Sequence, residues 1–248
     1  MQIVSFFLVI SGVFCVNNAL YYDLSWGFDN NTIYWPNAKT FNFTKKLAGY
    51  NKKFWYSANE FEAGEHGGTH FDAPYHFNKD GWKVGELPFT RLISKGALVD
   101  VSQLVPDTLN NFELLPIHLE DWERKNGPFE SDTILLIKFG HSKHWTNREK
   151  YLGLIEDKLN FPGISESAAQ WIVNRKKFYG VGVDTASVDP GNSTDFKAHQ
   201  IFANAQLFNI ENAKIVEKLP EKGFKLFVLP MKIEEGTGAP LRLVAEVN

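Results

Sequence analysis

Three histidines and one aspartate fall within eleven residues of a single short segment, and this segment constrains the fold more than any other part of the sequence. From residue 66 to residue 77 it reads HGGTHFDAPYHF. Two adjacent glycines and a proline make a continuous helix unfavourable, so extended backbone is expected. Residues of one parity then share a face. The chemically active face carries His66, His70, Asp72 and His76.

The same segment predicts a metal site. In a straight strand, residues four apart would be separated by about 13 Å, too far to bind one ion. We therefore expect the chain to bend at the glycine pair. His66, His70 and Asp72 would then supply two imidazoles and a carboxylate, a set that suits Zn²⁺, Mn²⁺ or Fe²⁺ and leaves positions for water and substrate. His76 would remain free to transfer a proton. The alternative is that these histidines only satisfy hydrogen bonds in an aromatic-rich turn.

A weaker second group lies downstream. His199 falls in a predicted helix, and Glu211 follows twelve residues later, after an apolar segment. Taken alone, either residue would be interpreted as a surface group, and only the first cluster suggests that they complete a metal site. His141 and His144 follow a predicted strand, and for them we expect side chains that face solvent.

The first residues predict a secretory signal peptide over residues 1–19. Residues 3–16 form an apolar run without charge, too short for a bilayer span of about 20 residues. A signal anchor or a buried core strand are the alternatives. Cys15, the only cysteine, lies in this run, so neither a disulfide nor a cysteine nucleophile is expected after cleavage. Secretion would give meaning to three N-glycosylation sequons, which begin at Asn30, Asn42 and Asn192.

Residues 20–248 are expected to form one domain of mixed α/β (α+β) class with a central sheet. Hydrophobic residues make up 44% of the chain and charged residues 22%, which indicates a folded protein. The net charge of −3, without a basic block, argues against nucleic-acid or membrane partners and favours a small molecule. Strands are predicted at 21–25, 53–62, 96–101, 133–139, 178–183, 224–233 and 241–247. Helices are predicted at 118–125, after Ser165 to about 177, and from a cap at Thr194 or Asp195 through 202.

Several enzyme classes have no motif here. The chain contains no G-x-S-x-G nucleophile elbow, no H-E-x-x-H helix and no P-loop. The Gly180-Val181-Gly182 stretch lacks the third glycine of a dinucleotide fingerprint. Hydride and phosphoryl transfer are therefore not supported by the sequence.

The segment from 66 to 77 resembles the HxGTHxDxPxHF signature of the cyclase-like metal-dependent hydrolases, which include bacterial-type kynurenine formamidase and isatin hydrolase. The resemblance extends over nearly the whole chain beyond the first 19 residues, through DLS at 23–25, GVDTASVD at 182–189 and GTGAPLR at 236–242. It implies a swivelling β/β/α fold and homo-oligomers, homodimers or homotetramers, whose interface shapes the substrate pocket. It also implies roles for individual residues: His76 as the catalytic histidine, with the metal ligands being His66, His70, Asp72, His199 and Glu211.

The resemblance predicts an amidohydrolase with one or two divalent ions per chain, Zn²⁺ foremost and Mn²⁺ as the alternative, and the predicted signal peptide makes it a secreted one. A bound ion lowers the pKa of water toward about 7, and the resulting hydroxide would attack an aryl formamide or cyclic amide, as in the conversion of N-formylkynurenine to kynurenine and formate. Glu211 favours two ions, because relatives with Gln there use one Mn²⁺. Trp35 and Trp82 are candidates for stacking on an aryl substrate. The alternatives are an isatin-hydrolase-like mononuclear cyclic amidase and a secreted binding protein without turnover.

Overall fold

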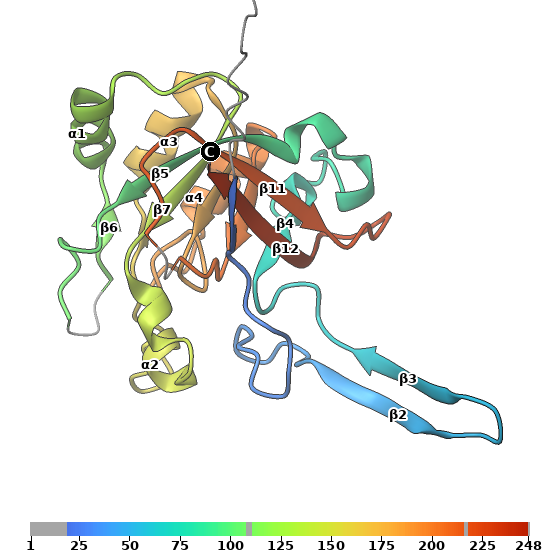
Figure 1. Cartoon of the computed structure of the whole chain (residues 1–248). Helices are drawn as coiled ribbons and strands as arrows, with labels where there is room; N and C mark the ends of the chain where they lie inside the picture. Colours follow the sequence, from blue (N-terminus) through green and yellow to red (C-terminus); the bar gives the residue numbers. More distant parts are fainter. Residues whose placement is uncertain (1–18, 108–110, 216–217, 248) are drawn as a thin grey trace, which may run out of the picture.

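A closed mixed β-sheet forms the centre of the protein (Figure 1). The computed structural model describes residues 19–107, 111–215 and 218–247. Of the predicted signal peptide, residues 1–18 and with them Cys15 lie outside the described residues. In the described part of the chain, no helix is both long and apolar enough to cross a membrane.

Twelve strands and four α-helices make up the described fold. The strands are β1 (Leu20–Asp23), β2 (Asn42–Tyr50), β3 (Trp55–Glu62), β4 (His70–Asp72), β5 (Ile93–Asp100), β6 (Glu113–Leu114), β7 (Thr133–Lys138), β8 (Gly163–Ile164), β9 (Phe178–Val183), β10 (Phe208–Glu211), β11 (Phe224–Pro230) and β12 (Gly238–Val247). The helices are α1 (Pro116–Asn126), α2 (Arg148–Leu152), α3 (Glu166–Arg175) and α4 (Lys197–Asn204), with 3₁₀ turns η1 (Pro74–His76), η2 (Val84–Glu86), η3 (Phe89–Arg91) and η4 (His141–His144).

Eight strands form the main sheet, in the order β1, β12, β11, β5, β7, β9, β10, β4. An additional pairing of β12 with β4 closes the sheet on itself and leaves β1 at an edge. The central strands β5, β7, β9 and β10 run parallel, and β4, β11 and β12 pair antiparallel with their neighbours. The expected mixed α/β class with a central sheet is confirmed. Strands β2 and β3 form a separate hairpin.

Two clusters of buried apolar side chains pack against the sheet. Inside the closed sheet, one cluster joins side chains such as Phe71, Leu136 and Phe208. Outside it, helices α1, α3 and α4 pack on the parallel strands through a second cluster that includes Trp122 and Phe202. Parallel strands buried on both faces need continuous apolar sequence, and TILLIK in β7 supplies it.

The predicted strands and the two earlier helices are present, and the N-cap of α4 was predicted wrongly. That cap is Phe196, in a left-handed conformation with φ of 51°, not Thr194 or Asp195. The first amides of α4 are instead bound by Asp189, a residue from another loop whose carboxylate accepts from the Ala198 N–H at 2.7 Å. A tertiary contact has therefore replaced the local cap. The sequence did not predict β2, β4, β6, β8, β10 and α2.

Ser165 caps α3, as expected, and provides a test of the packing of this helix. Its buried Oγ accepts from the Ala168 N–H at 3.1 Å and donates to the Leu114 carbonyl at 2.7 Å. We expect Ser165→Ala to lower the free energy of unfolding by about 1 to 2 kcal/mol, measured by urea denaturation. The exposed Ser57→Ala, outside this helix, is the control. Equal losses in the two variants would contradict the assignment.

Candidate metal centre

The bend that the histidine cluster requires is present at the glycine pair. Gly68 has φ of +58°, a left-handed conformation that favours glycine. A side chain on Gly67 would collide with the ring of Tyr34. After this bend the chain enters β4, which holds His70 and Asp72.

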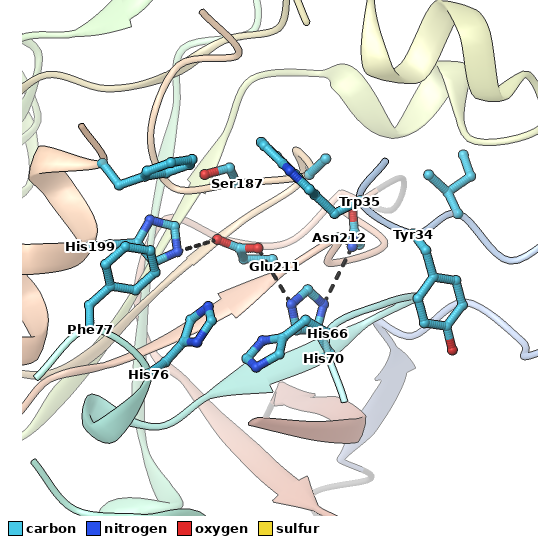
Figure 2. A pocket seen from close by; sticks show the side chains of 13 residues that line it. Tyr34, Trp35, His66, His70, His76, Phe77, Ser187, His199, Glu211 and Asn212 are labelled. Carbon is cyan, nitrogen blue, oxygen red and sulfur yellow. Dashed lines mark hydrogen bonds and ion pairs between the residues drawn. The ribbon is translucent and has the colours of Figure 1, made fainter. Parts of the chain in front are cut away.

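Strand pairing and a helix bring the second group to the first (Figure 2). Strand β10 lies antiparallel to β4, and Glu211 is directly opposite His70 in the register. Helix α4 presents His199 from the other side, and η1 presents His76. The structure therefore brings His199 and Glu211, more than 120 residues away in the sequence, to the four residues of the first cluster.

Four distances define the centre. The Nε2 atom of His70 lies 3.2 Å from Asp72 Oδ1 and 3.4 Å from Glu211 Oε2. The Nε2 atom of His199 lies 3.4 Å from Asp72 Oδ2 and 3.0 Å from Glu211 Oε1. Asp72 and Glu211 thus each lie between the same two imidazoles. On the outer side, His66 Nδ1 lies 2.7 Å from Asp72 Oδ1.

Hydrogen bonds outside the centre fix which nitrogen of each ring carries a proton. His70 Nδ1 lies 3.0 Å from the Gly68 carbonyl, and His199 Nδ1 lies 2.6 Å from the Asp189 carboxylate. Both partners only accept, so in both rings Nδ1 donates and Nε2 is the nitrogen that faces the carboxylates.

In His66 the outer hydrogen bond is made by Nε2 and not by Nδ1. Its Nε2 lies 2.8 Å from the hydroxyl of Thr237, and that hydroxyl donates to Glu65 at 2.6 Å. Because the hydroxyl proton is used on Glu65, the Thr237 oxygen accepts from the His66 Nε2–H. Its Nδ1 lies at hydrogen-bond distance, 2.7 Å, from Asp72 Oδ1. All three rings therefore turn a nitrogen toward carboxylate oxygens.

The pKa shifts of the histidines and carboxylates show that this centre favours positive charge. Burial opposes charge on His70, yet the Asp72 and Glu211 carboxylates outweigh it and raise the pKa of His70 to about 10. Burial likewise opposes charge on His199, and its carboxylate partners raise its pKa well above the usual range. Burial raises the pKa of Asp72, but the neighbouring histidines hold it well below the usual value. The carboxylates therefore stay ionised and attract cations.

The residues present fit a divalent ion better than they fit a network of hydrogen bonds. His70 Nε2 and Asp72 Oδ2 are buried without a hydrogen-bond partner. Charge-assisted hydrogen bonds are about 2.7 to 2.9 Å long, shorter than the four distances here. Ligand atoms about 2.0 to 2.1 Å from a tetrahedral ion lie about 3.3 Å from one another. Two imidazoles and two carboxylates at 3.0 to 3.4 Å match that spacing.

His76 stands at the edge of the centre rather than within it. Its ring stacks on His66, with ring centroids 3.9 Å apart. A potential ligand atom of His76 lies within 4.8 Å of those of His66 and Asp72. The protein atoms around His76 lower its pKa to about 4 by desolvation, although the side chain stays exposed at the cavity, so its imidazole is neutral at pH 7.

The centre forms the polar floor of a cavity of about 270 Å³. Its walls are largely aromatic and include Trp35, Phe77 and Phe196 (Figure 2). Trp35 therefore lines the cavity, as expected. The structure does not bring Trp82 there, because its ring is held against the guanidinium of Arg91 at 4.6 Å.

The remaining candidate residues lie apart from the centre. His141 is buried, contrary to the expectation of a solvent-facing ring, because its Nε2–H donates to the Tyr151 carbonyl at 2.6 Å. The three sequon asparagines are exposed, and they remain predicted glycosylation sites: Asn30, Asn42 and Asn192.

Sequence reasoning missed the residues that orient the ligands. Asp189 ends a GVDTASVD stretch, Thr237 lies in a GTG turn, and Glu65 directly precedes His66. The only local signal in the sequence is the position of Glu65 directly beside His66, a candidate ligand. The contacts themselves join residues as far apart as Glu65 and Thr237, so spacing could not reveal them.

Comparison with known proteins assigns the family. The family model described as "Putative cyclase" matches residues 22–190. The chain belongs to the cyclase family. It is 30% identical over 196 residues to isatin hydrolase from Roseibium aggregatum, covering 74% of this chain and 72% of that protein. It is 29% identical over 224 residues to kynurenine formamidase from Bacillus cereus, covering 90% and 95%.

A solved structure agrees with this family assignment. Isatin hydrolase A from Ralstonia solanacearum superimposes with a TM-score of 0.85 at 25% identity, covering 93% of both chains. This confirms the cyclase-type fold that the resemblance implied. The chain is therefore a cyclase-family hydrolase similar to isatin hydrolase and kynurenine formamidase.

Asp189 offers a test of the ligand geometry. In Asp189→Asn, an amide N–H in place of the carboxylate oxygen would donate to His199 Nδ1 and move the ring proton to Nε2. We expect affinity for Zn²⁺ to fall roughly 10- to 100-fold, measured by competition with a chromogenic chelator. The exposed Asp195→Asn, in the same loop, should bind normally. Unchanged affinity in Asp189→Asn would contradict the orienting role.

Proposed function

We propose that this chain is a metal-dependent amidohydrolase that cleaves an aryl formamide, like kynurenine formamidase, or a cyclic amide, like isatin hydrolase. The observation that carries the proposal is the arrangement of three imidazole nitrogens around two buried carboxylates at the floor of an aromatic cavity. Zn²⁺ is the proposed ion, with Mn²⁺ as the alternative. The ligands would be His66, His70, Asp72, His199 and Glu211.

A divalent ion held by these residues would lower the pKa of a bound water toward about 7 and polarise a carbonyl group. The aromatic walls would hold an aryl ring by stacking and apolar contact, with Trp35 and Phe77 on the cavity lining. They would also exclude bulk water from the reacting atoms. The volume of about 270 Å³ suits a small substrate.

His76 is the proposed proton carrier. Its ring lines the cavity beside His66 and is neutral at pH 7, so it can accept a proton from the attacking water. It would then deliver that proton to the amide nitrogen as the C–N bond breaks. The products would be a carboxylate and an amine.

Hydrolysis of N-formylkynurenine and of isatin, each measured before and after chelation, tests the proposed reaction. Chelation should abolish turnover of at least one substrate, and Zn²⁺ or Mn²⁺ should restore it. If remetallated protein that binds metal cleaves neither substrate, the amidohydrolase proposal fails and a binding protein that keeps the fold takes its place.

His76→Ala separates chemistry from metal binding. We expect kcat to fall roughly 100- to 10,000-fold, the usual contribution of a general acid or base, while metal content stays near that of the wild type. Metal content is measured by elemental analysis and turnover by absorbance. Wild-type turnover in the variant would remove His76 from the mechanism, and lost metal would make it a ligand instead.

The proposal includes the number of ions that each chain binds. Each carboxylate of the pair lies between two imidazoles, and this geometry favours two ions bridged by Asp72. We expect Glu211→Gln to reduce the metal stoichiometry from about two to about one per chain, because the neutral amide is a poorer ligand. Unchanged stoichiometry near one in both proteins would favour the mononuclear alternative.

We also propose that the protein is secreted, on the basis of the apolar run at residues 3–16 and the exposed sequons. Expression in a eukaryotic secretory host, followed by N-terminal sequencing, tests this. A mature N-terminus near residue 20 in the medium is expected. Retention of the full chain in the cell would contradict it.

A further inference from the structure

A second cavity lies at the opposite end of the sheet from the metal centre. It is called the lysine pocket here, after Lys95, Lys222 and Lys225 in its lining. The pocket lies near the start of the parallel strands β5 and β7, whereas the candidate ligand Glu211 ends the parallel strand β10. Its volume is about 300 Å³, and it shares no lining residue with the cavity at the metal centre. A cavity of this size can hold one small molecule.

An aromatic pair forms one wall of the lysine pocket. Trp122 in α1 and Phe129 stack with ring centroids 4.1 Å apart and an angle of 2° between the ring planes. The Trp122 Nε1–H donates to the Leu98 carbonyl at 2.8 Å, so the polar atom of the indole is satisfied within the protein. Phe224 adds a third ring to the lining. A flat apolar surface of this kind favours the ring of an aromatic ligand.

The charged side chains of the lysine pocket are mostly cations. Its lining holds three ammonium groups but only one carboxylate, that of Glu130. Glu130 forms an ion pair with Lys95, and the ammonium group of Lys222 donates to the carbonyl of Asn126. These contacts neutralise only one of the three positive charges. The pocket therefore attracts an anion.

Two of these lysines oppose each other across the sheet. Lys225 in β11 lies directly opposite Lys95 in the antiparallel register with β5, an arrangement that is destabilising for like charges. On its other side Lys225 lies opposite Glu246, but in the described part of the chain no ion pair includes Lys225. Its ammonium group lies 5.9 Å from the centroid of the Phe227 ring instead. A carboxylate bound near Lys95 and Lys225 would relieve their repulsion.

We propose that the lysine pocket binds a planar aromatic carboxylate, with the ring against Trp122 and Phe129 and the carboxylate near Lys95 and Lys225. An inorganic anion would leave the aromatic wall uncovered, and a neutral aromatic molecule would leave the excess positive charge uncompensated. A planar aromatic carboxylate satisfies both features at once. This site is independent of the proposed hydrolysis, because no residue of the metal centre takes part in it.

A ligand-observed NMR titration with 2-naphthoate tests the class of ligand. We expect a dissociation constant of about 1 mM or lower. The isosteric 2-naphthamide lacks the charge and cyclohexanecarboxylate lacks the aromatic ring, so each should bind roughly tenfold more weakly. Equal binding of either compound, or no binding of 2-naphthoate, would overturn the proposal.

Substitutions in the lysine pocket test the place of binding. Lys95→Gln combined with Lys225→Gln should weaken the binding of 2-naphthoate roughly tenfold. Glu130→Gln removes the only carboxylate of the lining and should strengthen this binding about two- to fivefold. Lys150→Gln combined with Lys232→Gln, at exposed positions outside the pocket, is the matched control and should bind like the wild type.

Wild-type affinity in either pocket variant would mean that the probe binds elsewhere, for example in the cavity at the metal centre, and would overturn the proposal. An equal loss of affinity in the control would reduce the effect to general charge attraction and would overturn it as well. Metal content near that of the wild type verifies that each variant is folded.

Discussion

The contacts of three imidazole rings with two buried carboxylates are the interaction on which the rest of this structure depends. Without positive charge, His70 Nε2 and Asp72 Oδ2 would be buried without partners, at a cost of about 1 to 3 kcal/mol for each unsatisfied group. The tautomers are not free to change, because Gly68, Asp189 and Thr237 hold the outer nitrogens. The fold thus holds the candidate ligands in place without an ion, and an ion bound by them would add to the stability of the fold.

The closure of the sheet positions the side chains of this centre. Strand β4 has only three residues, yet it pairs with β10 on one side and β12 on the other. The first pairing places Glu211 opposite His70. The second brings the turn before β12, with Thr237, to the outer nitrogen of His66. Closure of the sheet and orientation of the candidate ligands therefore depend on the same two strand pairings, so a change in register would disrupt both.

The sequence predicted the centre well where the chemistry was local, and less well where contacts were distant. Two glycines beside alternating ligands predicted the bend, which Gly68 confirms with its positive φ. Periodicity could not show β4, because three residues between a bend and a proline carry too little pattern. Strand β10 was overlooked for a similar reason. Trp82 was a reasonable aromatic candidate, but Arg91, which follows nine residues later, holds it away from the cavity. The cap of α4 was misplaced because Asp189, from another loop, performs that role.

The most direct test of this account is anomalous diffraction from crystals grown with Zn²⁺ or Mn²⁺, recorded at the absorption edge of the ion. The account predicts at least one peak among His70, Asp72, His199 and Glu211, beside Nε2 of at least one of the two histidines. A site without a peak at full occupancy of added metal, or peaks only elsewhere, such as beside His141 and His144, would contradict it.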